Sequence, residues 1–285
     1  MQQSGAVCEF ANSDSWVILS PIEQSIKRKI EVVGTPLKDW DINIYRGVLT
    51  GYNEAFIIST EKREEILANC QSDDERERTA ELIRPILRGR DIKRYGYNWA
   101  NLWLINTHNG IRGKLERIHI EDYPAVKAHL DHYWDRISKR ADKGDTPYNL
   151  RNCAYLEDFS KPKIVWGNLN LRPSYAIVEY NSFINAPSPM IVPASRYLLA
   201  ILNSKLADYF IRQLGVTRNG GYFEYKPMFI EQLPVPQCLD DSILKEINTN
   251  ATIKNEKIID TIVYSLYGLN DEEIQYIEKG TQENY

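Results

Sequence analysis

Residues 44–58 read IYRGVLTGYNEAFII, and this is the stretch of the chain that says most about the fold. Apolar residues flank a glycine-bearing turn at residues 50–53, a pattern that predicts two short strands joined by that turn. Glycine in such a turn lets the backbone approach another surface closely. Arg46, Thr50 and Asn53 would present polar groups there, so we take them as candidate binding residues. An ordinary hairpin tip is the alternative.

Outward from this stretch, short strands mix with helices. Ser20 and Pro21 precede isoleucines at helical spacing, and Gly34 is expected to end that helix. Strands are expected at residues 102–105, 163–166, 175–178 and 190–192, and longer helices at residues 122–141 and 195–214. The order lacks the regular alternation of a doubly wound sheet. We therefore predict an α+β fold, a mixed-sheet domain with interleaved helices and a helical C-terminal tail.

A change in composition after residues 234–236 predicts a boundary near Gln237. Residues 1–237 would form the main domain, and residues 238–285 a helical extension. The 285 residues are 43% hydrophobic and 26% charged, which is ordinary for a globular protein. No apolar run approaches the ~20 residues of a membrane-spanning helix, and no secretory pattern is visible, so we expect a cytoplasmic protein without a membrane partner.

A formal net charge of −4 argues against a broadly basic surface for nucleic acid. Many of the carboxylates, however, gather at residues 73–75, 240–241 and 271–273. These are predicted helix starts, where the helix dipole favours negative charge. The basic residues cluster elsewhere, so local phosphate binding stays compatible with the composition.

Motifs for catalysis are hard to find. The sequence contains no GxGxxG, no P-loop and no (Asn/Asp)-Pro-Pro-(Tyr/Phe) loop of the kind that holds a flipped base in amino-methyltransferases. His129 and His132 have the spacing of helical metal ligands but no obvious third ligand, and the four cysteines form no close pair. We therefore predict no catalytic and no metal-binding residues in this chain.

Residues 84–95 read RPILRGRDIKRY, the densest basic run. Arginine and lysine suit phosphate contacts, and arginine can also bind guanine with two hydrogen bonds. The candidates here are Arg88, Arg90, Lys93 and Arg94. A solvated loop in which Asp91 pairs internally is an equally weighted alternative.

Two further polar clusters are present along the chain. Residues 215–223 (GVTRNGGYF) offer Thr217, Arg218 and Asn219, although a glycine-rich helix end would explain the same letters. Arg151, together with Asn168 and Arg172 of residues 166–172 (WGNLNLR), forms the other cluster. Asparagine can bind adenine with two hydrogen bonds. Trp166 and Tyr175 lie in apolar runs and are expected in the core rather than stacked on bases.

The segments at residues 44–58 and 84–95 resemble parts of the TaqI-like C-terminal specificity domain. Six further segments match the same domain in the same order along the chain: GTPLKDW (34–40), PYNLR (147–151), FSKPKIVW (159–166), LAILNSK (199–205), FIEQLPVP (229–236) and IDTIVYSLYGL (259–269). That domain occurs in type IIG restriction enzymes and DNA adenine methyltransferases. The resemblance extends from about residue 16 to residue 277.

The resemblance implies a DNA target-recognition domain with duplex DNA as its partner. In that family an N-terminal methyltransferase half supplies the S-adenosylmethionine site and the Pro-Pro loop, and both are missing here. We therefore expect no cofactor in this chain and a methyltransferase domain or separate methyltransferase chain as its partner. The alternative is a protein-docking module for that methyltransferase, with little DNA specificity of its own.

Overall fold

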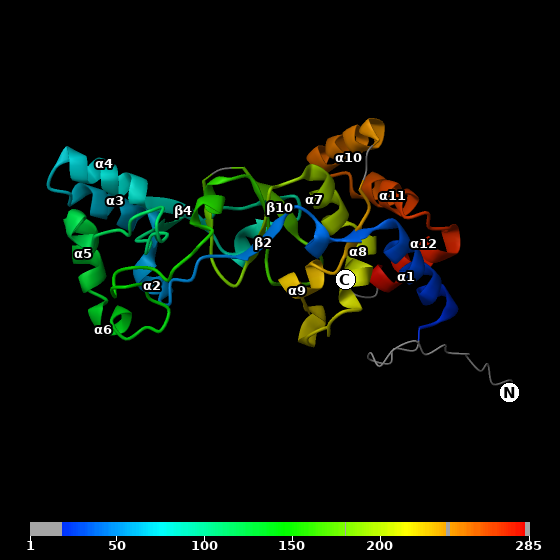
Figure 1. The fold of residues 1–285 in the computed structure, drawn as a ribbon, viewed down its shortest axis with the longest axis horizontal. Coiled ribbons are helices and arrows are strands. Elements are labelled where there is room, and N and C mark those ends of the chain that lie inside the picture. The colour runs from blue at the N-terminus through cyan, green and yellow to red at the C-terminus, as the bar shows by residue number, and fades with distance from the viewer. Residues whose placement is uncertain (1–18, 180, 238–239, 283–285) are drawn as a thin grey trace.

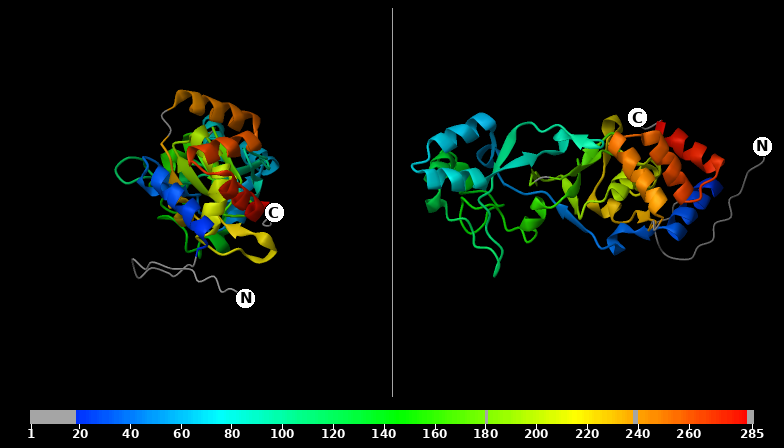
Figure 2. Two further views of the ribbon diagram at one scale, coloured as in Figure 1. Left: turned by 90° about the vertical axis from the view of Figure 1, so that its right-hand side faces the viewer. Right: turned by 90° about the horizontal axis from the view of Figure 1, so that it is seen from above.

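A computed structural model describes residues 19–179, 181–237 and 240–282. The molecule is elongated, with helices at both ends and strands between them (Figures 1 and 2). The confirmed fold class is α+β, because helices and mixed sheets are interleaved along the chain.

The central sheet has the order β10-β8-β12-β2, and every neighbouring pair is antiparallel. Its strands are Tyr175–Val178, Lys163–Trp166, Pro189–Val192 and Asn43–Arg46. Ile164 and Trp166 pack in one hydrophobic core, whereas Val165 packs in a second core on the other face. Because both faces are covered, residues 164–166 of β8 form a continuous apolar run instead of an alternating one.

The second sheet has the order β11-β4-β7-β3 and belongs to the second core. Its strands are Phe183–Ile184, Ile83–Leu87, Leu102–Ile105 and Ile57–Ser59. The β11–β4 pair is parallel and the other two pairs are antiparallel. Around this sheet lie α2 (Asn53–Phe56), α3 (Thr60–Ala68), α4 (Asp73–Leu82), α5 (Pro124–Asp131) and α6 (Trp134–Ile137).

The first core is mainly helical. It contains buried residues of α1 (Pro21–Val33), α7 (Arg196–Asn203), α8 (Lys205–Arg212), α10 (Asp241–Ile253), α11 (Glu256–Leu266) and α12 (Asp271–Gln282). The predicted start of α1 is confirmed, because Ser20 and Glu23 form a reciprocal capping box. The three helices after residue 240 pack in the same core as α1, so the boundary near Gln237 stays a prediction.

Short elements complete the fold. The remaining strands pair as β1 (Thr35–Pro36) with β14 (Pro234–Val235), β5 (Ile92–Lys93) with β6 (Gly96–Tyr97), and β9 (Leu169–Asn170) with β13 (Phe223–Glu224). A short helix, α9, covers Pro227–Ile230, and 3-10 turns occupy Leu37–Asp39, Gly89–Asp91, Ile120–Asp122, Leu156–Ser160 and Asn219–Gly221.

The two strands predicted within residues 44–58 are present, but they do not form the hairpin that was the alternative. The first strand, β2, pairs with β12 in the central sheet, and the second strand, β3, pairs with β7 in the other sheet. Between them, residues 53–56 form α2. The segment therefore carries the chain from one sheet to the other, and the two strands never meet.

Two long predicted helices are each divided. The stretch at residues 122–141 forms α5 and α6, with a break at His132 and Tyr133. The stretch at residues 195–214 forms α7 and α8, because Ser204 adopts an extended conformation and its hydroxyl caps α8 by accepting from the Ala207 N–H. Serine bonding to nearby backbone competes with helix continuation, which apolar spacing alone does not reveal.

Candidate nucleic-acid interface

An open cleft of about 760 Å³ lies where segments of both sheets meet. It is lined by the start of α2 and by residues 88–90, 167–170 and 185–188. The structure thereby brings together four of the candidate residues proposed from sequence: Asn53, Arg88, Arg90 and Asn168. These come from three separate segments, so only the tertiary fold makes them neighbours.

Two glycines let the segments that line the cleft pack closely. A Cβ atom on Gly89 would lie 2.8 Å from the Ser188 Oγ atom, and one on Gly167 would lie 3.1 Å from the Gly89 carbonyl oxygen. Larger residues at these positions would push the lining segments apart. With glycine at both, the turns at residues 88–90 and 167–170 lie against each other and bring their polar side chains to one cleft.

Arg88 and Arg90 lie in the same turn but differ in function. The Arg88 guanidinium donates to both oxygens of Asp91, at 3.0 and 2.8 Å, and the Arg88 N–H donates to the same carboxylate at 2.9 Å. Burial opposes ionisation of Asp91, but these hydrogen bonds outweigh burial and lower its pKa. Arg88 therefore holds the turn in place. This agrees with the alternative interpretation of residues 84–95, in which Asp91 pairs within its own loop.

Arg90, by contrast, is exposed, and within the residues described here its guanidinium has no hydrogen bond or ion pair. Of the two carboxylates that line the cleft, Glu224 pairs with Lys226 and Arg218, at 2.6 and 3.2 Å, and these bonds lower its pKa. Glu54 accepts a hydrogen bond from the Tyr52 hydroxyl at 2.5 Å. Arg90 is therefore a cation that the cleft offers to a ligand.

The wall formed by α2 rests on Thr50 and on Arg140, a residue that the sequence analysis missed. Thr50 is buried, and its hydroxyl donates to Asn53 Oδ1 at 2.6 Å, which leaves the Asn53 Nδ2 donor available. The Arg140 guanidinium donates to the carbonyl oxygens of Thr50, Asp142, Pro147 and Asn149. Burial lowers the pKa of Arg140 to about 10, so it stays charged at neutral pH. Nothing in the local sequence marks this role.

The opposite wall rests on a buried ionic network. Strands β9 and β13 pair, and the Tyr225 N–H donates to the Asn168 carbonyl at 2.9 Å. Beneath them the Arg212 Nε donates to Asp208 Oδ1 at 2.9 Å, and the Tyr225 hydroxyl donates to the same oxygen at 2.8 Å. Arg212 also donates to the Leu171 carbonyl. This network fixes residues 167–172 to α8.

The other candidates lie outside the cleft lining. Lys93 donates to the Arg90 carbonyl at 2.8 Å, and Arg94 is paired with Glu256 of α11 at 2.6 Å. Arg151 pairs with Asp142, and Arg218 with Glu224. The rest, Arg46, Arg172, Thr217 and Asn219, are exposed. Trp166 and Tyr175 are fully buried, which confirms their place in the core.

Asn185 and Ser188 also line the cleft, and the sequence analysis named neither. Both belong to NAPS at residues 185–188, which directly follows β11. Turn residues at a strand end were a usable signal. Their relevance becomes visible only when β11 pairs with β4 and lies beside the Arg88 turn.

Within residues 19–179, 181–237 and 240–282 no group of three or more His, Cys, Asp or Glu side chains is placed to hold a metal ion. His129 Nε2 lies 2.9 Å from the Ala55 carbonyl and His132 Nδ1 lies 2.6 Å from the Ala128 carbonyl, so each ring contacts a main-chain oxygen. None of the described helices combines the length and apolar character needed to cross a bilayer.

The TaqI-like C-terminal specificity domain matches residues 84–235. The chain is 22% identical over 281 residues to Type II methyltransferase M.BstVI of Geobacillus stearothermophilus, and 21% identical over 285 residues to Type II methyltransferase M.PaeR7I of Pseudomonas aeruginosa. These matches include 94% and 95% of this chain but 47% of each methyltransferase. The chain thus spans about half the length of these relatives.

Two solved structures share the fold. The type IIL restriction-modification enzyme MmeI, in complex with DNA, superposes with a TM-score of 0.62 at 13% identity, over 88% of this chain and 36% of that one. The type IIG restriction endonuclease BpuSI gives a TM-score of 0.57 at 13% identity, over 92% of this chain and 32% of that one. The resemblance found in the sequence is therefore confirmed at the level of family and fold.

Proposed function

Because the chain belongs to the family of the TaqI-like C-terminal specificity domain, we propose that it recognises a specific sequence of duplex DNA for a restriction–modification enzyme. The cleft carries this proposal, since polar side chains from separated segments converge there and two glycines let those segments pack closely. Sequence is read by hydrogen bonds to base edges, and carboxamide and guanidinium groups can make two such bonds to one base. Asn53, Asn168 and Arg90 supply these groups.

Phosphate contacts would come from exposed cations in spite of the net charge of −4. Arg46, Arg90 and Arg172 are exposed, and their side chains have no ion pair among the described residues. Such cations release condensed counterions when they bind phosphates, so binding should weaken as salt rises.

We propose that the chemistry is supplied elsewhere. Methyl transfer, with S-adenosylmethionine as cofactor, and any nuclease activity would belong to an N-terminal methyltransferase domain or to a separate methyltransferase chain. The length of the curated relatives supports this division, because about half of each lies outside the match. The chain alone would then position a catalytic partner without being an enzyme.

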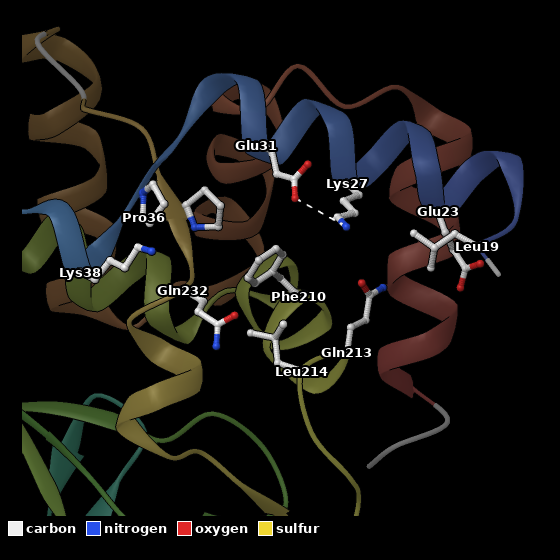
Figure 3. Close-up of a pocket in the computed structure, with 11 residues that line it drawn as sticks. Leu19, Glu23, Lys27, Glu31, Pro36, Lys38, Phe210, Gln213, Leu214 and Gln232 are labelled. Carbon is white, nitrogen blue, oxygen red and sulfur yellow. Dashed lines mark ion pairs between the residues drawn. The ribbon is translucent and has the colours of Figure 1, made fainter. Parts of the chain in front are cut away.

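A second candidate function is docking of that methyltransferase, and a groove of about 560 Å³ favours it. In Figure 3, Phe210 and Leu214 lie between α1 and the segment that carries Gln232. Lys27 and Glu31 form an ion pair at 3.8 Å along α1, beside the groove. An apolar floor with a charged rim is a common composition for a protein contact.

The proposal is tested by selecting bound molecules from a pool of random duplex DNA, at low and at moderate salt. We expect one enriched motif, and weaker binding to it by Arg90→Ala. Arg28→Ala, on the exposed face of α1, is the matched control and should bind as the unchanged chain does. Weak binding without any enriched motif would contradict DNA recognition by this chain and favour docking. Docking predicts that Lys27→Glu, which reverses a charge on the rim of the groove, weakens binding to a methyltransferase chain in the absence of DNA.

A further inference from the structure

Asn185 lies in a turn whose backbone is fixed from two sides. Its N–H donates to the Leu87 carbonyl at 2.8 Å, and its carbonyl accepts from the Ser188 N–H at 3.1 Å. It also forms a parallel bridge with Val48, and the Ala186 N–H donates to the Val48 carbonyl at 3.0 Å. The Cα of Asn185 therefore has a defined position between the segment after β2 and the end of β4.

The side chain of Asn185, unlike its backbone, makes no hydrogen bond within the described part of the chain. It lines the cleft and is half-buried. Two other carboxamides of the cleft are each used once: Asn53 Oδ1 accepts from Thr50, and Asn170 Nδ2 donates to the Gly167 carbonyl. Asn185 thus keeps both an acceptor and two donors for a ligand.

We propose that Asn185 determines specificity by binding an adenine base in the major groove. Its Nδ2 would donate to adenine N7, and its Oδ1 would accept from the adenine N6 amino group, the bidentate pairing that carboxamides make with this base. The inference rests on the proposed function, since it assumes that the cleft faces duplex DNA. It adds the residue that discriminates and the base that it prefers.

The arrangement around Asn185 favours contact with a base over contact with a phosphate alone. A carboxamide is neutral and attracts phosphate weakly, whereas its paired donor and acceptor match one edge of adenine. Because the backbone of Asn185 is already fixed, binding has to order only its side chain and not the turn. Gly89 and Gly167 let the turns that line the cleft pack closely, which holds Asn185 and Arg90 in one lining.

The test compares three variants of the chain by selection from random duplex DNA. Asn185→Ala removes both bonds, so we expect one position of the motif to lose its adenine preference by about 5- to 150-fold. Asn185→Asp keeps the size but offers only acceptors, so the preference at that position should move towards cytosine, whose N4 amino group donates. Asn248→Ala, on the exposed surface of α10, is the carboxamide control and should leave the motif unchanged.

The outcomes separate the two proposals. If the unchanged chain enriches a motif and both Asn185 variants enrich the same motif with the same stringency, Asn185 reads no base while DNA recognition stands. If the unchanged chain enriches no motif, both proposals are overturned. Thermal unfolding of each variant checks folding, and we expect no change because the Asn185 side chain has no described partner.

Discussion

Two buried arginines support the two walls of the cleft, and they do so by different chemistry. Arg212 lies beneath the β9–β13 wall and pairs with the fully buried carboxylate of Asp208. Arg140 lies beneath the α2 wall, 7% exposed, and makes no ion pair within the described residues. Its guanidinium is surrounded by main-chain carbonyl oxygens and stacks on the Phe56 ring at 4.4 Å.

The two walls should therefore differ in the substitutions that they tolerate. Loss of Arg212 would leave Asp208, which is 0% exposed, without its paired cation. Loss of Arg140 would leave only neutral carbonyl oxygens without this donor, since the nearby Asp142 pairs with Arg151. The residues that face the cleft, such as Arg90, rest on these supports and contribute little to stability themselves. Stability and DNA binding should therefore depend on different residues.

The largest expected effect on stability comes from Arg212→Met. A buried ion pair broken on one side typically costs about 3–5 kcal/mol, because the remaining charge is uncompensated. We expect a loss of that size in the free energy of unfolding measured with urea. The double variant Asp208→Asn/Arg212→Met should be less destabilised than Arg212→Met alone. If the two are equally stable, the charge of Asp208 does not govern this wall.

Arg140→Met should have an intermediate effect. Hydrogen bonds to a charged group contribute about 1.5–3 kcal/mol, and the freed carbonyls are neutral, so we expect a loss within that range. Arg151→Met is the matched control, because its ion pair with Asp142 is exposed and should contribute less than about 1 kcal/mol. Equal losses in the two variants, measured in urea, would refute the supporting role of Arg140.

Thr50→Val tests whether the hydrogen bond from Thr50 to Asn53 holds the Asn53 side chain in place at the cleft. The buried hydroxyl of Thr50 bonds Asn53 Oδ1, and loss of one such bond costs about 1 kcal/mol of unfolding free energy. DNA selectivity should fall as well, because Asn53 is then free to rotate. A variant that is destabilised but keeps its selected motif unchanged would show that Asn53 does not contact DNA.

The smallest effect on stability is expected for Arg90→Ala, within about 0.5 kcal/mol, as for other surface substitutions. Its DNA binding should nonetheless weaken, and the slope of log affinity against log salt should fall by about 1 if Arg90 contacts a phosphate. Arg88→Ala, in the same turn, should reverse this order and destabilise the fold, because Asp91 loses a bidentate partner. If the two variants lose the same stability and the same DNA affinity, Arg88 and Arg90 do not have the different roles assigned to them.

Much of the local structure could be predicted from sequence. The caps at Ser20, Ser59 and Ser72 each accept a hydrogen bond at the start of a helix, and the acidic clusters lie at the starts of α4, α10 and α12. Apolar runs such as residues 163–166 form buried strands. These signals depend on interactions within a few residues, so the sequence contains all the partners.

The candidate site could be predicted only in part. Arg90 and Asn168 do line one cleft, but Arg94 is tied to Glu256, and Thr50 is buried beneath Asn53. Asn185 and Arg140 escaped notice because their significance depends on segments distant in sequence: Asn185 meets Leu87, and Arg140 meets Thr50. No local pattern encodes such a meeting.

Helix starts, several of the longer strands and the family could be predicted from the sequence, because spacing, caps and the order of motifs are local properties of the chain. Tertiary structure alone decided that residues 44–58 cross between two sheets and that β8 is covered on both faces. It also decided that Arg88 pairs with Asp91, whereas Arg90 has no ion pair among the described residues. A strand pairs with whichever strand the fold places beside it, and a buried charge pairs with whichever group the fold places near it. Either partner can lie anywhere in the chain, so neither can be read from neighbouring residues.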